Sequence, residues 1–343
     1  MMAKEATLFV WIAALCIFDS GNTVCSAQSL KIEKVLEKRI SESELSAIGL
    51  SPSGGQLAIG DAVGNLILVD TQSLVTEKQV KVDPAASLSS ICFISEVAIA
   101  ACDKNGEVHI KSALGLNALT ESLPVTAIKF VEVAGSSENR VVVFAKHDSI
   151  LIRDSEEISY KIPVKFPHEI AISDLAEDQL AVVGAWAPCL LVFDIANGEK
   201  LEAFQLRELA GEENLPEYVV GLSFDPFTGH FVVLCANDYR IWVAVVSIAQ
   251  KKVVKVLEKS SRGPLVGIEV LPGGVVCAYG HDVLFWDIES GNEIGKINHP
   301  KTATGPANPF FTDLCILPSD NPRVITVFLS TTDGTLEKYT LSN

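Results

Sequence analysis

The histidines of this chain are the first residues to test for metal binding or proton transfer. Six are present, scattered along the sequence: His109, His147, His168, His230, His281 and His299. A metal site built from one segment places histidine, cysteine or acidic ligands at short spacings, and we find no such local group. His281 and Asp282 are neighbours, which favours a turn pair over two ligands. The sequence therefore predicts no catalytic residue, no metal and no cofactor, although a site assembled from distant segments stays open.

The cysteines are the second set of candidates. Apart from Cys16 and Cys25, six remain, each within or at the end of an apolar run: Cys92, Cys102, Cys189, Cys235, Cys277 and Cys315. This placement is typical of buried thiols, which behave as small hydrophobic side chains, although a Cys277–Cys315 disulfide stays open. The short motifs of serine hydrolases, zinc proteases, nucleotide-binding loops and dithiol oxidoreductases do not occur in the sequence.

Composition narrows the function classes further. The chain has 343 residues, of which 48% are hydrophobic and 20% are charged, so it is too apolar for a disordered protein and too long for a small disulfide scaffold. Its net charge is −16. Nucleic-acid binding relies on neutralising phosphates with lysine and arginine, so we expect no nucleic-acid partner.

The N-terminal segment has the pattern of a secretory signal peptide. Residues Ala6 to Phe18 form an uninterrupted apolar run of 13 residues, whereas a bilayer span needs roughly 20. Small residues follow, and cleavage after Ala27 is expected. Leu15 and Val24 are too bulky to precede a lipoprotein cysteine. The sequence thus predicts a signal peptide over 1–27 and a secreted or periplasmic protein; an uncleaved membrane anchor and a buried strand are the alternatives.

An internal repeat then indicates which elements must position any site. LLVFDIANGE (190–199) and VLFWDIESGNE (283–293) each contain an alternating strand, Asp-Ile and a glycine turn. The equivalent position is traced along the chain as Asp70, Lys111, Asp154, Asp194, Val245, Asp287 and Thr340. Most intervals fall within the range of about 40–45 residues that propeller blades show. The two longer ones contain inserts at 206–217 and 298–309.

Strand and turn patterns complete each unit. Segments 46–60, 219–235 and 265–280 share an alternating strand, a Pro/Gly/Ser turn and a second apolar strand, which is typical of an antiparallel meander. From Phe310 onward the chain offers only three strands, and the missing fourth is found at Leu30 to Ile40. KVLEK occurs there, at 34–38, and again at 255–259. We therefore predict an all-β, seven-bladed propeller over 28–343, closed by an N-terminal outer strand in the last blade.

The predicted blades are roughly 41–82, 83–123, 124–165, 166–206, 215–259, 262–298, and 307–343 plus 30–40. These units resemble the WD-repeat family through Trp286-Asp287 and the looser pairs Val69-Asp70, Arg153-Asp154 and Phe193-Asp194. The family's turn aspartate is matched by Asp61, Asp103, Asp148, Asp238, Asp282 and Asp333. The family's Gly-His pair is missing where each repeat should open, so we expect no Asp–His–Ser–Trp hydrogen-bond network.

The resemblance implies turns and inserts on one face, where a protein partner would dock. Aromatic residues and arginine are favoured anchors of such contacts. The candidate partner-binding residues are Trp186, Tyr239, Arg240, Tyr279, His281, Phe310, Phe311, Glu212, Glu213 and Glu217; the alternative is that Trp186 and the phenylalanines pack into the rim or channel.

We expect a non-enzymatic, protein-binding scaffold that is a monomeric ring. One alternative is a propeller enzyme of the quinoprotein or lactonase type with a central-channel site. Another is an intracellular scaffold that keeps its N-terminal anchor.

Overall fold

In the computed structural model, the residues that can be described form an all-β protein. They are 29–82, 86–96, 98–105, 107–112, 119–122, 125–132, 140–146, 149–153, 158–164, 167–173, 179–184, 189–194, 198–206, 218–225, 228–236, 240–260, 265–271, 274–298, 309–317, 321 and 324–342. These residues form 28 strands and no α-helix. The all-β, antiparallel prediction is therefore confirmed.

The strands form four-stranded antiparallel sheets, seven in the described part of the chain. The first sheets are β2 (Leu45–Leu50), β3 (Gln56–Asp61), β4 (Asn65–Asp70) and β5 (Thr76–Lys81); β6 (Leu88–Ser95), β7 (Ala98–Asp103), β8 (Glu107–Ser112) and β9 (Leu119–Ser122); β10 (Val125–Glu132), β11 (Arg140–Lys146), β12 (Ser149–Arg153) and β13 (Ile158–Pro163).

The remaining sheets follow the same order. They are β14 (Pro167–Ser173), β15 (Gln179–Gly184), β16 (Cys189–Asp194) and β17 (Lys200–Gln205); β18 (Tyr218–Asp225), β19 (His230–Ala236), β20 (Arg240–Ser247) and β21 (Lys252–Ser260); β22 (Leu265–Leu271), β23 (Val275–Gly280), β24 (Asp282–Asp287) and β25 (Glu293–Asn298); and β26 (Phe311–Leu317), β27 (Val324–Thr331) and β28 (Thr335–Ser342) with β1 (Lys31–Arg39).

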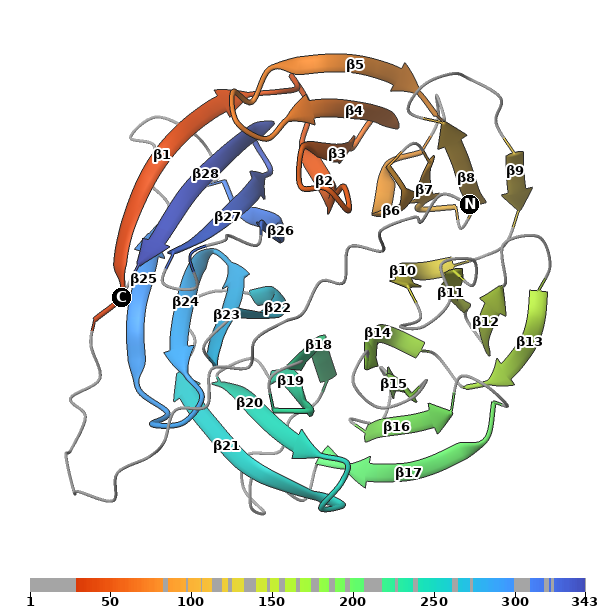
Figure 1. The fold of residues 1–343 in the computed structure, drawn as a ribbon, viewed down its shortest axis with the longest axis vertical. Coiled ribbons are helices and arrows are strands. Elements are labelled where there is room, and N and C mark those ends of the chain that lie inside the picture. Colours follow the sequence, from red (N-terminus) through yellow and green to blue (C-terminus); the bar gives the residue numbers. More distant parts are fainter. Residues whose placement is uncertain are drawn as a thin grey trace, which may run out of the picture.

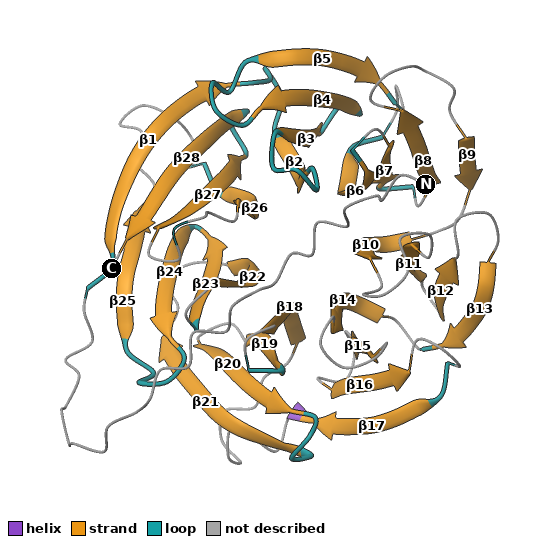
Figure 2. Ribbon diagram, in the orientation of Figure 1, coloured by secondary structure: helices purple, strands orange, loops and turns teal. Residues whose placement is uncertain are grey.

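The sheets lie side by side around a common centre, with β2, β6, β10, β14, β18, β22 and β26 as the innermost strands (Figure 1). Each innermost strand contacts those of the two neighbouring sheets, and β26 contacts β2, which brings the last sheet against the first. Figure 2 shows that strands account for nearly all of the described ribbon and that the connections drawn as described loops are short turns.

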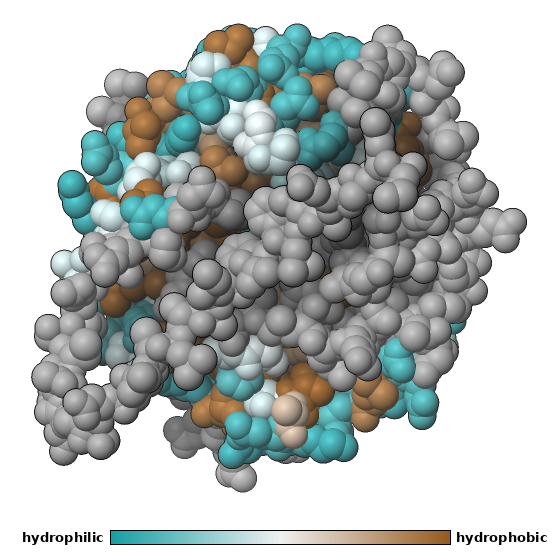
Figure 3. All heavy atoms as spheres, viewed as in Figure 1, coloured by the Kyte–Doolittle hydropathy of each residue, from teal (hydrophilic) through white to brown (hydrophobic). Residues whose placement is uncertain are grey.

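The core lies between neighbouring sheets rather than inside any one of them. One cluster joins Val232, Leu234 and Val243 to Val276 and Trp286 of the next sheet. Because the middle strands are covered on both faces, they read as continuous apolar runs, and every residue of β23 is buried. The last strands alternate between exposed and partly buried residues, as β5 does, and Figure 3 shows hydrophilic side chains along that rim. This layering explains the high hydrophobic content of the chain.

The N-terminal strand completes the last sheet, as predicted. β1 pairs antiparallel with β28, from Lys31 opposite Ser342 to Arg39 opposite Thr335. Beyond the ladder, the backbone N–H groups of Ile40 and Ser41 both donate to the Gly334 carbonyl, at 2.8 and 3.2 Å. Lys34 Nζ lies 2.6 Å from the Glu337 carboxylate, which also accepts the Tyr339 hydroxyl at 2.6 Å. The first and last strands of the described chain, β1 and β28, are thus joined by backbone hydrogen bonds and by side-chain contacts.

The strand register corrects part of the repeat alignment. Asp70 lies opposite Gln56, the first residue of its neighbouring strand. The matching positions in other sheets are Ser112, Ser247 and Ser342, not Lys111, Val245 and Thr340. The sequence prediction misplaced these positions because the three units have serine there and no aspartate to mark the position.

The side chains at this position support the corrected repeat alignment. A side-chain oxygen of Asp70 accepts the N–H of the residue three positions later at 2.8 Å, and the hydroxyl of Ser247 does the same at 3.2 Å. Either side chain therefore caps the turn into the last strand.

Candidate functional site

The innermost strands of neighbouring sheets run in the same direction. Ser46 Oγ donates to the Leu88 carbonyl at 2.5 Å, near the start of β2 and β6. Ser223 Oγ donates to Glu269 at 3.0 Å, between β18 and β22. The starts of these strands, and the turns between the second and third strands, therefore lie on one side of the molecule. We call this side the start face.

A hollow of about 410 Å³ opens among the innermost strands on the start face. It is lined by Glu44, Ser46, Leu88, Ser89, Lys104, Val266, Phe310, Phe311, Thr312 and Thr332. Val266 is 45% exposed, whereas Phe311 is fully buried. We call this hollow, with the lining residues just given, the axial hollow. It combines an accessible apolar side chain with one acidic and one basic residue.

Two of the predicted partner-binding residues meet at the edge of this hollow. Phe310 lines it, and its ring centroid lies 5.9 Å from that of His281 in an edge-on contact. His281 Nδ1 lies 3.6 Å from an Asp282 carboxylate oxygen, so these neighbours do form a local pair. Asp282 also accepts Lys296 Nζ at 2.6 Å.

Tyr279 has a different role from the one expected. It is 7% exposed, and its hydroxyl donates to Asp313 at 3.0 Å. Asp313 also accepts the backbone N–H of Ile48 at 2.8 Å. The expectation of an exposed anchor is wrong because β23 is covered by the sheets on both sides. Tyr279 instead helps to join three neighbouring sheets.

Of the other predicted partner-binding residues, only the backbone of Arg240 is described: it begins β20 and pairs with Ser260. Trp186, Tyr239, Glu212, Glu213 and Glu217 lie outside the described residues.

Cys277 and Cys315 are both free thiols, so the disulfide between them is not formed. Cys102, Cys235 and Cys277 are buried as expected, but Cys92, Cys189 and Cys315 are partly exposed. Burial raises the pKa of Cys102 to about 11 and that of Cys235 to about 12. Neither is a reactive thiolate at neutral pH.

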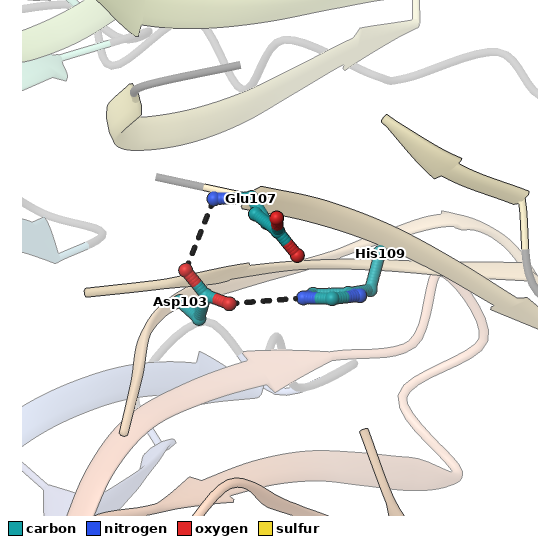
Figure 4. Close-up of side chains that lie close together, drawn as sticks. All are labelled: Asp103, Glu107 and His109. Carbon is teal, nitrogen blue, oxygen red and sulfur yellow. Dashed lines mark hydrogen bonds and ion pairs between the residues drawn. The ribbon is translucent and has the colours of Figure 1, made fainter. Parts of the chain in front are cut away.

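The sequence analysis missed a local cluster formed by Asp103, Glu107 and His109. The ligand atoms of these side chains all lie within 4.8 Å of one another. Asp103 and His109 are 0% and 3% exposed, and Glu107 is partly exposed. Figure 4 shows the His109 ring aimed at one Asp103 oxygen and the Glu107 carboxylate turned toward the same space.

Hydrogen bonds hold Asp103 in its ionised form. Although burial opposes ionisation, donation from His109 and from the backbone N–H groups of Glu107 and Asn105 keeps the pKa of Asp103 below its ordinary value. Asp103 therefore caps the turn, as predicted, and Asp61 does so in the first sheet. In the last sheet Thr331 shares this role with Asp333. Asp148 and Asp238 lie outside the described residues.

One signal could have revealed the cluster. Glu107 and His109 are two residues apart, so a strand places them on one face, directly after a turn aspartate. The sequence prediction considered only ligands closer to each histidine and therefore missed the acidic residues two and six positions before His109.

Comparison of the chain with family models and with curated proteins found no match. Within the described ranges, no helix has the length and apolar character needed to cross a membrane.

Proposed function

We propose that this chain is a seven-bladed propeller of the WD-repeat type that serves as a non-enzymatic, protein-binding scaffold. Three observations support the propeller: four-stranded antiparallel sheets in chain order, contacts between successive innermost strands, and the pairing of β1 with β28. In this interpretation each sheet is one blade, and the N-terminal strand closes the ring. Closure removes the unpaired edges that an open array would leave.

The axial hollow is the observation that carries the functional proposal. Val266 and Phe310 present apolar surface at its mouth, and Glu44 and Lys104 supply charges of both signs. Protein interfaces combine an apolar centre with a polar rim. The partner proposed here therefore inserts an apolar side chain into the hollow and places charged groups near Glu44 and Lys104.

Two carboxylates of the innermost strands, those of Asp313 and Glu269, support a scaffold over a central-channel enzyme. Asp313 accepts hydrogen bonds from Ile48 and Tyr279 of the two neighbouring sheets, and Glu269 accepts one from Ser223. These acids join sheets together. An enzyme of the quinoprotein or lactonase type would instead need them to converge on a ligand.

Substitution of Val266 tests the docking site. A partner recovered by affinity capture is expected to bind Val266→Glu at least about tenfold more weakly, because truncating or charging a central anchor costs about 1.4 kcal/mol or more. The measurement is a titration of purified partner against each variant. Val254→Glu is the matched control, since Val254 is an exposed valine, 37% accessible, on the outer strand β21.

The comparison of these two variants decides the location of the docking surface. Weaker binding by Val266→Glu alone supports the axial hollow. Equal affinity of both variants, with unchanged melting temperatures, would move the docking surface away from it.

We also propose export of the protein, for which the 13-residue apolar run and the small residues before Ala27 are the support. These residues precede the described part of the chain. Intact-mass measurement of natively expressed protein is expected to show loss of about 27 residues, since signal peptides are removed after their small-residue site. A soluble cytosolic protein that keeps residue 1 would contradict export.

A further inference from the structure

We propose that Asp103, Glu107 and His109 bind a divalent transition-metal ion, with Zn²⁺ the best match to their chemistry. This site goes beyond the docking function proposed above and does not depend on it.

The two oxygens of Asp103 have different hydrogen-bond partners. Oδ1 accepts the backbone N–H groups of Asn105 and Glu107, at 2.8 and 3.0 Å. Oδ2 lies 3.1 Å from His109 Nε2. The turn therefore fixes the carboxylate through one oxygen and presents the other to the imidazole. A metal ligand held in this way needs little reorganisation on binding.

The positions of Glu107 and His109 hold different residue types in the first sheet. Counting four and six residues after the turn aspartate gives Glu107 and His109 in the second sheet, but Asn65 and Ile67 in the first. Ile67 is 1% exposed and packs in an apolar cluster. In the first sheet the fold thus places an apolar residue at this position. In the second sheet a buried imidazole occupies the position instead, together with a second carboxylate.

Two carboxylates and one imidazole make up the donor set, and their spacing suits a transition-metal ion. Imidazole favours transition-metal ions, and Mg²⁺ and Ca²⁺ prefer sites made of oxygen alone. Around a tetrahedral Zn²⁺ with bonds of about 2.1 Å, neighbouring ligand atoms lie about 3.4 Å apart. Asp103 and His109 are already near that separation, at 3.1 Å. Glu107 is partly exposed, so its side chain can rotate inward to complete three protein ligands, with water at the remaining position.

The competing explanation is that Asp103 and His109 form only a buried hydrogen-bonded pair. In that case the side chain of Glu107 takes no part in the pair, and Glu107 variants bind added metal ions with the same affinity as the wild-type protein. In our proposal the ion replaces the proton between the two groups and recruits Glu107. The role of Glu107 therefore separates the two explanations.

The test is a titration of the full chain, treated with a chelator, with Zn²⁺ alone. Calorimetry is expected to show one saturable ion per chain, and a Zn²⁺ concentration of 100 times Kd is expected to raise the melting temperature by about 5 °C. Glu107→Gln is expected to weaken binding at least about tenfold with an unchanged metal-free melting temperature. His109→Ile, which copies the first sheet, is expected to abolish binding.

Two controls separate this site from other ligands in the chain. His281→Gln changes the partly exposed His281–Asp282 pair and is expected to leave the affinity for Zn²⁺ unchanged. Co²⁺ used as a second probe is expected to give a spectrum without thiolate charge-transfer bands, because the six described cysteines are not ligands. Absence of saturable binding, equal affinity in Glu107→Gln and the wild-type protein, or a thiolate spectrum overturns the proposal.

Discussion

Removal of residues 29–40 is expected to lower the melting temperature by about 10 °C or more and to cause aggregation. Leu30 and Ile32 pack with the core cluster between the last two sheets, and Leu36 and Ile40 pack with the next cluster. Losing their partial burial costs about 5 kcal/mol, which for a domain of this size corresponds to about 10 °C. Scanning calorimetry and size-exclusion chromatography are the measurements.

Aggregation is expected because the deletion exposes β28 as an edge. Its backbone groups from Thr335 to Ser342 lose their partners in β1, and an unpaired edge is a template for pairing with another chain. Glu337, which is 2% exposed, also loses its ion pair with Lys34. The control is a synthetic peptide with residues 29–40, which is expected to restore solubility in trans, while a scrambled peptide does not. A truncated protein that stays monodisperse with an unchanged melting temperature would contradict this role of β1.

Gly334→Ala is expected to destabilise the protein by about 3 kcal/mol or more, because two separate penalties add. Gly334 has φ of 86°, and a left-handed backbone costs other residues about 1–2 kcal/mol. A Cβ at this position would lie 2.8 Å from the Ser43 carbonyl oxygen and closer still to that of Ser41. These are backbone atoms of the segment that joins β1 to β2, and they cannot move without breaking the hydrogen bonds of Ile40 and Ser41 to the Gly334 carbonyl.

The chain offers matched controls for this substitution. Gly229 and Gly274 have φ of 69° and 74°, but a Cβ added at either would meet nothing within 4 Å. Gly229→Ala and Gly274→Ala are therefore expected to cost only the backbone penalty, about 1 kcal/mol each. Chemical denaturation of the three variants measures the difference. Equal losses in all three would show that the contact between Gly334 and the β1–β2 segment contributes nothing to stability.

The turns between third and fourth strands show how far local sequence reasoning reaches. Gly198 and Gly291 occupy the left-handed positions expected of the glycine turns in the repeat, with φ of 72° and 76°. Leu74 and Lys251 take the same position with φ of 54° and 50°. No glycine signalled these turns in the sequence. Leu74 is fully buried, so core packing compensates for its backbone strain.

Alternating apolar residues, turn glycines and the near-forty-residue repeat determined the strands, their antiparallel order and the pairing of residues 30–40 with the last unit. Such features depend on local backbone geometry and on a period of two along a strand, and both can be read from one chain. The turn roles of Asp61 and Asp103 were predictable for the same reason, since each caps the backbone of residues close to it in the sequence.

Only the tertiary structure decided which side chains share a site. Tyr279 has the residue type of a surface anchor, yet the sheets on both sides bury it, and Asp313, 34 positions along the chain, accepts its hydroxyl. The axial hollow joins Val266 to Glu44 and Lys104, which lie in the segments next to the first and second sheets. The Asp103–Glu107–His109 cluster depends on the turn that folds β7 back beside β8, which brings His109 Nε2 within 3.1 Å of Asp103. Contacts between sheets and across turns depend on packing in three dimensions, and the alternation within a strand does not encode them.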